Sequence, residues 1–455
     1  MEDGFDLVVC GGTVVDDRGR ARLDVCVRDG KIAALRPPGT AYPGAEIVDA
    51  DGLVVLPGMV DTHVHFMDPG DPTREDFPTG SGAAAVRGVT TVVEHTHGWP
   101  VIDRASFAEK QEHLSGRSYV DFGLAAHVWP DRIHELPDLW SMGISYFKAF
   151  TCTTHGVPGL DNHALLEVAE TMASLDAPCL VHCEDDAVTD RDERALREQG
   201  RSDPGLISCW RSREAEMLAV SVVLMAARLR GARLIIAHAS HYDVLEAIAL
   251  ERQRGTRVSA EGCLQYFLLR EDEVEAHGAL RKFTPPARLR SDEEERRMWS
   301  ALDGGLIGHV ASDHAPSTVA QKEQGTIWDV PFGLPGVDTT LPLLVDAALT
   351  GRIALERVAA LYAFEPARLY RLAGKGRIAA GYDADLALID PTATWTLQDD
   401  DIRSRAGWSP YSGRPLRGRT AGTMLRGEMI ARDGALLAEE RRRGRFIPGP
   451  GHRSS

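Results

Sequence analysis

Short apolar runs alternate with stretches of helical periodicity through the middle of the chain. Eight of these runs have the length and β-branched content of buried strands, at residues 60–66, 90–95, 121–128, 144–150, 179–183, 234–238, 257–262 and 306–313. The segment between Ser212 and Leu229 is rich in Ala, Leu, Met and Glu, which are strong helix formers. Eight β–α units predict an α/β fold, a (β/α)₈ TIM barrel over residues 57–375.

Both ends of the chain have a different pattern, in which short β-branched runs are separated by turns. In residues 1–56 the dipeptide Asp29-Gly30 between apolar runs is typical of a tight hairpin. A similar pattern returns in residues 376–437. Each set is too short to bury a core alone, so we expect one small β-sandwich built from both segments. Residues 438–455 contain three consecutive arginines and then Pro-Gly-Pro-Gly, which predicts a poorly ordered tail.

The amino-acid composition says more about the possible binding partners of the protein than about its fold. The 455 residues are 43% hydrophobic, enough for a large core. A formal net charge of −16 argues against a nucleic-acid partner.

Seven scattered cysteines without a C-x-x-C pair favour reduced thiols in the cytoplasm. No uninterrupted apolar stretch approaches the roughly 18 residues of a membrane span, so we expect a soluble, unprocessed cytoplasmic chain that acts on a small molecule.

Polar residues that can bind a metal follow the predicted strands. His63 and His65 end the first strand, and residues two apart in a strand share a face, so both imidazoles can reach one divalent ion. The active sites of such barrels lie at the carboxyl ends of the strands, where further candidates occur at Lys148, His182, His238 and Asp313. Taken one at a time, each histidine also fits a core residue, Lys148 a lysine that extends its ammonium to solvent, and Asp313 a helix cap. Six of them at strand ends indicate a metal site.

These motifs resemble those of the amidohydrolase superfamily, and more narrowly its cyclic-amide branch of allantoinases, hydantoinases (dihydropyrimidinases) and dihydroorotases. The resemblance runs from the first β segments through residues 58–65 to residues 376–385. It implies two divalent metal ions, expected to be zinc, and a homotetramer. His63, His65 and Asp313 would bind the buried ion, and His182 and His238 the more exposed one. Lys148 would be N-carboxylated and bridge both, with a hydroxide as second bridge.

The chemistry gives a reason for these assignments. A protonated lysine has no lone pair to offer, whereas the carbamate formed from its neutral amine and CO₂ is an anionic ligand with two oxygens. Two cations lower the pKa of water held between them, so hydroxide is available near neutral pH. Asp313 is then expected to accept the proton of the attacking hydroxide and return it to the departing ring nitrogen. We interpret Cys183, Glu184 and His241 as supporting residues.

Three segments bear on the substrate. Dihydroorotases usually follow the H-x-H motif with an arginine that pairs with the substrate carboxylate; Met67 stands there and disfavours dihydroorotate. Hydantoinases usually carry a tyrosine shortly after the bridging lysine, and residues 150–156 contain none. Residues 150–153, 180–184 and 409–414 look most like allantoinases. We therefore expect allantoinase-like opening of allantoin or a related ureide, with these residues near the substrate: Met67, His95, Thr153 and Thr284.

Other functions remain open at this point. Residues 94–100 and 328–333 depart from the allantoinase pattern where substrate should lie, so a hydantoinase, dihydropyrimidinase or cyclic-imide hydrolase is an alternative. A non-catalytic scaffold similar to dihydropyrimidinases is disfavoured by the complete set of ligands. Deamination by a single metal ion is disfavoured by Lys148, and phosphoester hydrolysis by the absence of an evident phosphate-binding motif.

Overall fold

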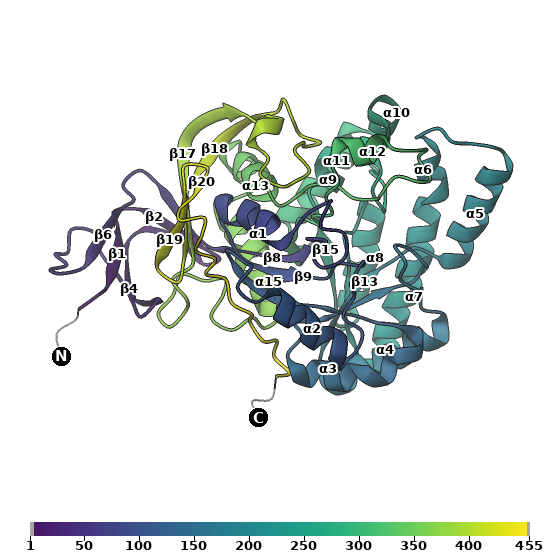
Figure 1. Ribbon diagram of the computed structural model, residues 1–455, viewed down its shortest axis with the longest axis horizontal. Coiled ribbons are helices and arrows are strands. Elements are labelled where there is room, and N and C mark those ends of the chain that lie inside the picture. The colour runs from purple at the N-terminus through teal and green to yellow at the C-terminus, as the bar shows by residue number, and fades with distance from the viewer. Residues whose placement is uncertain (1–3, 453–455) are drawn as a thin grey trace.

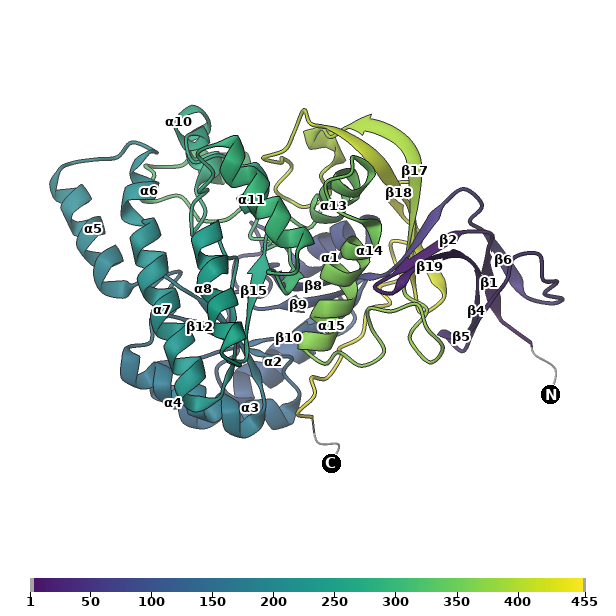
Figure 2. The same cartoon turned by 180° about the vertical axis from the view of Figure 1, so that it is seen from behind.

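The computed structural model describes residues 4–452, which form a barrel with a β-sandwich at one side (Figures 1 and 2). The barrel strands are β8 (Met59–Val64), β9 (Val89–Glu94), β10 (Asp121–Leu124) with β11 (Ala126–His127), β12 (Phe147–Phe150), β13 (Pro178–His182), β14 (Arg233–Ile236), β15 (Val258–Gly262) and β16 (His309–Val310). Neighbouring strands in this order are parallel. All eight predicted barrel strands are therefore present.

Backbone hydrogen bonds close the barrel between its first and last strands. The amide of His65 donates to the carbonyl of His314 at 2.7 Å, and the amide of His314 donates to that of His63 at 3.3 Å. Inside the barrel an apolar layer includes Val93, Tyr146 and Leu180. Because strand residues two apart share a face, the residues that follow them on this inner face are His95, Lys148 and His182. The apolar layer thus packs inside the barrel directly next to the polar residues at the strand ends.

Helices surround the barrel in both views (Figures 1 and 2). They are α1 (Phe77–Val86), α2 (Arg104–Leu114), α3 (Leu136–Met142), α4 (Asn162–Leu175), α5 (Asp186–Glu198), α6 (Leu206–Trp210), α7 (Arg213–Arg230), α8 (Tyr242–Gln253), α9 (Gln265–Leu268), α10 (Glu273–His277), α11 (Asp292–Asp303), α12 (Val319–Glu323), α13 (Thr340–Leu349), α14 (Leu355–Ala359) and α15 (Glu365–Leu369). The predicted helix is α7, which begins after the capping hydroxyl of Ser212 and ends at the left-handed Gly231. Within residues 4–452 no helix is both long and apolar enough to cross a bilayer.

Two sheets form the sandwich. The first contains β1 (Leu7–Cys10), β4 (Asp24–Arg28), β5 (Lys31–Arg36) and β6 (Glu46–Asp49). The second contains β2 (Thr13–Asp16), β3 (Gly19–Arg22), β7 (Val54–Pro57), β17 (Leu386–Thr396), β18 (Pro415–Leu425), β19 (Glu428–Arg432) and β20 (Ala435–Leu436). Antiparallel pairing of β7 with β17 joins the two ends of the chain, and both ends supply one apolar core, as predicted.

The segment after Ala438 is not the poorly ordered tail that its composition predicts. As far as residue 452 it lies along the barrel, where the amide of Phe122 donates to the carbonyl of Arg445 at 2.9 Å and that of Gly449 to Gly143 at 2.6 Å. A Cβ atom on Gly444 would lie only 1.9 Å from the carbonyl oxygen of Val120. Glycine here permits close backbone contact, which composition alone does not distinguish from flexibility.

Candidate active site

The six predicted metal-binding side chains lie together in one cavity at the carboxyl ends of the barrel strands. The cavity has a volume of about 340 Å³. Its wall includes all six: His63, His65, Lys148, His182, His238 and Asp313. Because they come from the ends of five different strands, β8, β12, β13, β14 and β16, only the closed barrel brings them together.

His63, His65 and Asp313 form the first group of donors. The Oδ1 atom of Asp313 lies 3.1 Å from Nε2 of His63 and 3.7 Å from Nε2 of His65. The other nitrogen of His63, Nδ1, lies 2.8 Å from Oε1 of Glu261, a buried carboxylate that also accepts the amide of His238 at 3.0 Å. Glu261 therefore holds the His63 ring with Nε2 directed toward Asp313, as the partners of metal-binding histidines commonly do.

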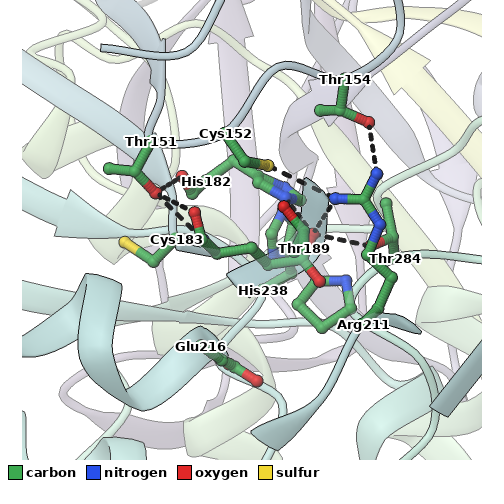
Figure 3. Close-up of polar contacts among 12 residues, drawn as sticks. Thr151, Cys152, Thr154, His182, Cys183, Thr189, Arg211, Glu216, His238 and Thr284 are labelled. Carbon is green, nitrogen blue, oxygen red and sulfur yellow. Dashed lines mark hydrogen bonds and ion pairs between the residues drawn. The ribbon is translucent and has the colours of Figure 1, made fainter. Parts of the chain in front are cut away.

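His182 and His238 form the second group (Figure 3). Nδ1 of His182 and Nε2 of His238 are 3.0 Å apart, so one ion at metal–nitrogen distances of about 2.0–2.1 Å can reach both. Nε2 of His182 lies 2.7 Å from Oε2 of Glu184, which also accepts from Arg211 at 3.2 Å and from the hydroxyl of Thr284 at 2.8 Å. Burial alone would raise the pKa of Glu184, but Arg211 and the bond to His182 lower it to about 2. Glu184 is thus a charged residue that orients His182.

Lys148 lies between the two groups without a polar partner. Its side chain is buried, and Nζ makes no hydrogen bond within the described part of the chain. Burial lowers the pKa of this amine, against the opposite effect of Glu261 and Asp313. A neutral amine is the form that reacts with CO₂. Four imidazoles, a carboxylate and this unpartnered lysine are a donor set that fits two divalent ions joined by a lysine carbamate.

The four residues predicted to contact substrate are not equivalent. Met67 and Thr284 line the cavity. Thr153 does not, because it is exposed and its hydroxyl accepts from the amide of Gly159 at 3.2 Å. His95 does not line it either, because it is fully buried and packs against the rings of His63 and His65. The geometry therefore gives no support to substrate contacts by Thr153 and His95.

Arg74 is a cavity residue that the sequence analysis missed. Its Nε donates to the carbonyl of Pro316 at 2.9 Å, and Nη2 donates to that of Phe332 at 3.2 Å. Burial lowers its pKa to about 10, against the opposite effect of the nearby Asp71, so it stays charged at neutral pH. Arg74 lies in a loop without a periodic pattern, and nothing in the local sequence marks it as a binding residue. His97, His155 and Phe332 also line the cavity.

Comparison with known proteins places the chain in a family. A profile of the amidohydrolase family matches residues 54–430, and the protein belongs to this family. Allantoinases from Rubrobacter xylanophilus and Solibacter usitatus are both 36% identical to it, covering 97% and 93% of this chain and the same shares of their own lengths. An allantoinase from Escherichia coli is 34% identical over 94% of this chain and 95% of its own.

Solved structures agree with this assignment. The L-hydantoinase (dihydropyrimidinase) from Arthrobacter aurescens has a TM-score of 0.91 and 30% identity over 98% of this chain and all of its own. Dihydropyrimidinase from Brevibacillus agri also has a TM-score of 0.91, with 27% identity over 99% of this chain and all of its own. These relatives indicate a cyclic amidohydrolase enzyme, which confirms the class and fold expected from the sequence. Metal dependence is general in this family.

Proposed function

We propose that the protein hydrolyses the ring amide of allantoin or a closely related ureide. The observation that carries this proposal is the complete donor set in one cavity, in a chain that is 34–36% identical to allantoinases over most of its length. His63, His65 and Asp313 would hold one zinc ion, His182 and His238 the other, and N-carboxylated Lys148 would join them. When bound, these ions lower the pKa of the attacking water and polarise the scissile carbonyl.

The protein's own residues move the proton and hold the substrate. Water adds to the ring carbonyl carbon, the carbon–nitrogen bond breaks, and Asp313 transfers the proton from the water to the departing nitrogen. Asp313 suits this role because its carboxylate lines the cavity beside the metal-binding histidines. Backbone near Thr284 would hydrogen-bond the ring amide. The guanidinium of Arg74 lines the cavity and can donate to the carbonyl of a ureido arm.

A comparison of substrates tests the activity. Steady-state kinetics on allantoin, hydantoins, dihydropyrimidines, cyclic imides and dihydroorotate should give the highest kcat/KM for allantoin. Met67 gives no charge where related enzymes use arginine to hold the carboxylate of dihydroorotate, so that compound should be poor. Arg74 does not replace that arginine, because its Nε and Nη2 already donate to the carbonyls of Pro316 and Phe332. A preference for dihydroorotate would contradict the proposal. A preference for hydantoins would support the second candidate, a hydantoinase, to which the structural likeness also points.

Lys148→Ala tests the bridge. The variant should lose metal and activity, because four imidazoles and one carboxylate supply no strong bridging anion between two dications. A short carboxylic acid should restore part of both. Metal analysis of the purified wild-type protein also distinguishes an enzyme from a non-catalytic scaffold. A Lys148→Ala protein with full metal content and normal turnover would exclude the carbamate.

We further propose a cytoplasmic homotetramer. The seven cysteines are all unpaired, which suits a reducing compartment. Large apolar side chains are exposed along one face of α7, at Leu218, Val222, Met225 and Leu229. Exposed apolar faces of this kind commonly mark subunit contacts.

A further inference from the structure

His95 is a buried histidine whose place in the molecule the proposed reaction does not explain. It follows β9 on the inner face of the barrel, two residues after Val93 of the apolar layer. Its ring centre lies 4.4 Å from that of His63 and 4.4 Å from that of His65. Ligand nitrogens of these three residues, one from each, lie within 4.8 Å of one another. His95 is therefore in reach of the same ion as His63 and His65.

A neighbouring tyrosine determines which nitrogen of His95 carries the proton. The hydroxyl of Tyr146 donates its single proton in a short hydrogen bond to the carbonyl of Thr62. Nδ1 of His95 lies 3.0 Å from the same hydroxyl oxygen, which can therefore only accept from it. Nδ1 of His95 is the N–H donor, and Nε2 carries the lone pair. Tyr146 thus orients His95 as the partners of metal-binding histidines orient them.

The lone pair of His95 Nε2 has no partner in the described structure. The atom is buried and makes no hydrogen bond with any residue in 4–452. The next histidine, His97, does not satisfy it, because the two ring centres are 6.2 Å apart and Nδ1 of His97 is 3.0 Å from Nε2 of His127. A buried acceptor without a partner is costly, and a bound cation would remove that cost.

We propose that Nε2 of His95 is a third imidazole ligand of the ion held by His63 and His65. The inference rests on the proposed metal site and adds a residue to its ligands. Three imidazoles favour a transition-metal ion such as zinc, cobalt or iron(II) over magnesium or calcium. The additional nitrogen should make this ion slower to leave than one held by two imidazoles, Asp313 and the Lys148 carbamate.

Cobalt-substituted protein tests the proposal without relying on activity. His95→Met replaces the imidazole nitrogen by a thioether sulfur, a much weaker ligand for Co²⁺, in a side chain of similar length. Tyr146→Phe keeps His95 but removes the partner of its Nδ1. His127→Asn is the control, because His127 is a buried neighbour outside the group of three. Each protein is loaded with Co²⁺. Its visible absorption spectrum and its rate of metal loss to a chelator are measured, and circular dichroism checks the fold.

We expect His95→Met to change the cobalt spectrum and to lose the ion at least about tenfold faster than wild type, with a smaller acceleration for Tyr146→Phe. His127→Asn should match wild type in both measurements. A wild-type spectrum and rate in folded His95→Met would overturn the proposal. If His95→Met does not fold, a wild-type spectrum and rate in Tyr146→Phe would do so instead. Failure of the wild-type protein to open any cyclic amide would contradict the proposed function but not this ligand assignment.

Discussion

Asp313 combines an unusual backbone with a buried carboxylate at the centre of the cavity. Its φ is +50°, in the left-handed region that aspartate tolerates better than most residues. Its Oδ2 accepts from the side-chain amide of Gln265 at 3.3 Å, while Oδ1 faces His63. The carboxylate thus has one oxygen beside the histidines proposed to bind metal, which is the position that the proposed proton carrier needs.

Asp313→Asn should separate proton transfer from metal binding. The amide is nearly the same size and its oxygen can still coordinate an ion, but it cannot accept the proton. We expect kcat to fall by about 100-fold or more, in line with the contribution of general acid–base catalysis, while the fold and most of the bound metal remain. Steady-state kinetics together with metal analysis on the same sample measures both. Near-normal kcat at full metal occupancy would exclude Asp313 as the proton carrier.

The pH profile follows from the same residue. Burial raises the pKa of Asp313 to about 6, against the lowering effects of His63 and Lys148. The carboxylate must be ionised to accept a proton, so activity should be lost as the pH falls through this pKa. In the loaded enzyme two bound dications favour the ionised form and outweigh the loss of the positive charge on carboxylated Lys148, so the acidic limb should lie at or below about pH 6. A rate profile for kcat/KM checks this, and an acidic limb centred above pH 7 would contradict it.

The sequence predicts the candidate ligands and Glu184, which supports His182, but not Glu261 or Arg74. His63, Lys148 and Asp313 stand out because each ends an apolar run, and barrel strand ends share one face. Glu261 is the buried partner of His63, but it lies inside a strand-like run, and no neighbouring sequence motif indicates that it supports a metal ligand. Arg74 reaches the cavity only because its loop folds against Pro316, 242 residues away. Contacts of that kind depend on the tertiary structure.

At the scale of elements, Lys375 connects the barrel to the sandwich. Its Nζ lies 2.6 Å from Asp121 on β10, 2.7 Å from Asp385 just before β17, and 2.9 Å from Asp383. The three carboxylates are close enough to hold a metal ion, but the ammonium of Lys375 lies among them. Lys375, Asp121 and Asp385 are all buried. Arg426 also pairs with Asp121, so within residues 4–452 Asp385 is the carboxylate that depends on Lys375 for its counter-charge.

Lys375→Met should lower the free energy of unfolding by about 3–5 kcal/mol, because it leaves the buried carboxylate of Asp385 without a counter-charge. Asp121 would keep Arg426, and Asp383 would keep Lys31. Burial already raises the pKa of Asp385, and loss of Lys375 would raise it further. Protonation removes the unpaired charge, so the difference from wild type should shrink as the pH falls. Urea unfolding at several pH values measures it. Lys31→Met is the matched control, since Lys31 pairs with Asp383 but is 54% exposed and should change stability by less than about 1 kcal/mol. Equal effects of the two substitutions would contradict this account.

Elements with strong local patterns were predictable, and those defined by packing were not. The barrel strands and α7 have continuous apolar or helical patterns, and the Asp29-Gly30 hairpin is present with φ values of 52° and 72°. The segment after Ala438 has no such pattern. Its order comes from backbone hydrogen bonds to residues more than 300 positions earlier, such as Phe122.

At the scale of the whole molecule, the alternation of strands and helices restricts the topology strongly. Parallel strands joined by helices form few closed arrangements, and eight units favour a barrel. The sandwich also follows from its composition, because two short β segments need a shared core. The pairing of β7 with β17 joins residues more than 300 positions apart, and the register of that pairing is set by the folded molecule.

The exposed face of α7 leads to a prediction about assembly. Leu218, Val222, Met225 and Leu229 are spaced by four, three and four residues, so they form one stripe on the helix. Their exposed fractions are 52%, 37%, 45% and 60%, and the stripe borders an apolar groove with Leu165 and Leu166 of α4. If a second copy of the chain covers this stripe, two lysines there would place charges in an apolar contact.

Leu218→Lys combined with Met225→Lys should therefore shift the protein from tetramers to smaller species at micromolar concentration, with the barrel still folded. Sedimentation velocity measures the assembly and circular dichroism the fold. Ile47→Lys is the matched control, because Ile47 is 53% exposed on β6 of the sandwich and should leave the assembly unchanged. A monomeric wild-type protein would contradict the proposed tetramer. A tetrameric double variant would show that subunits associate through another surface.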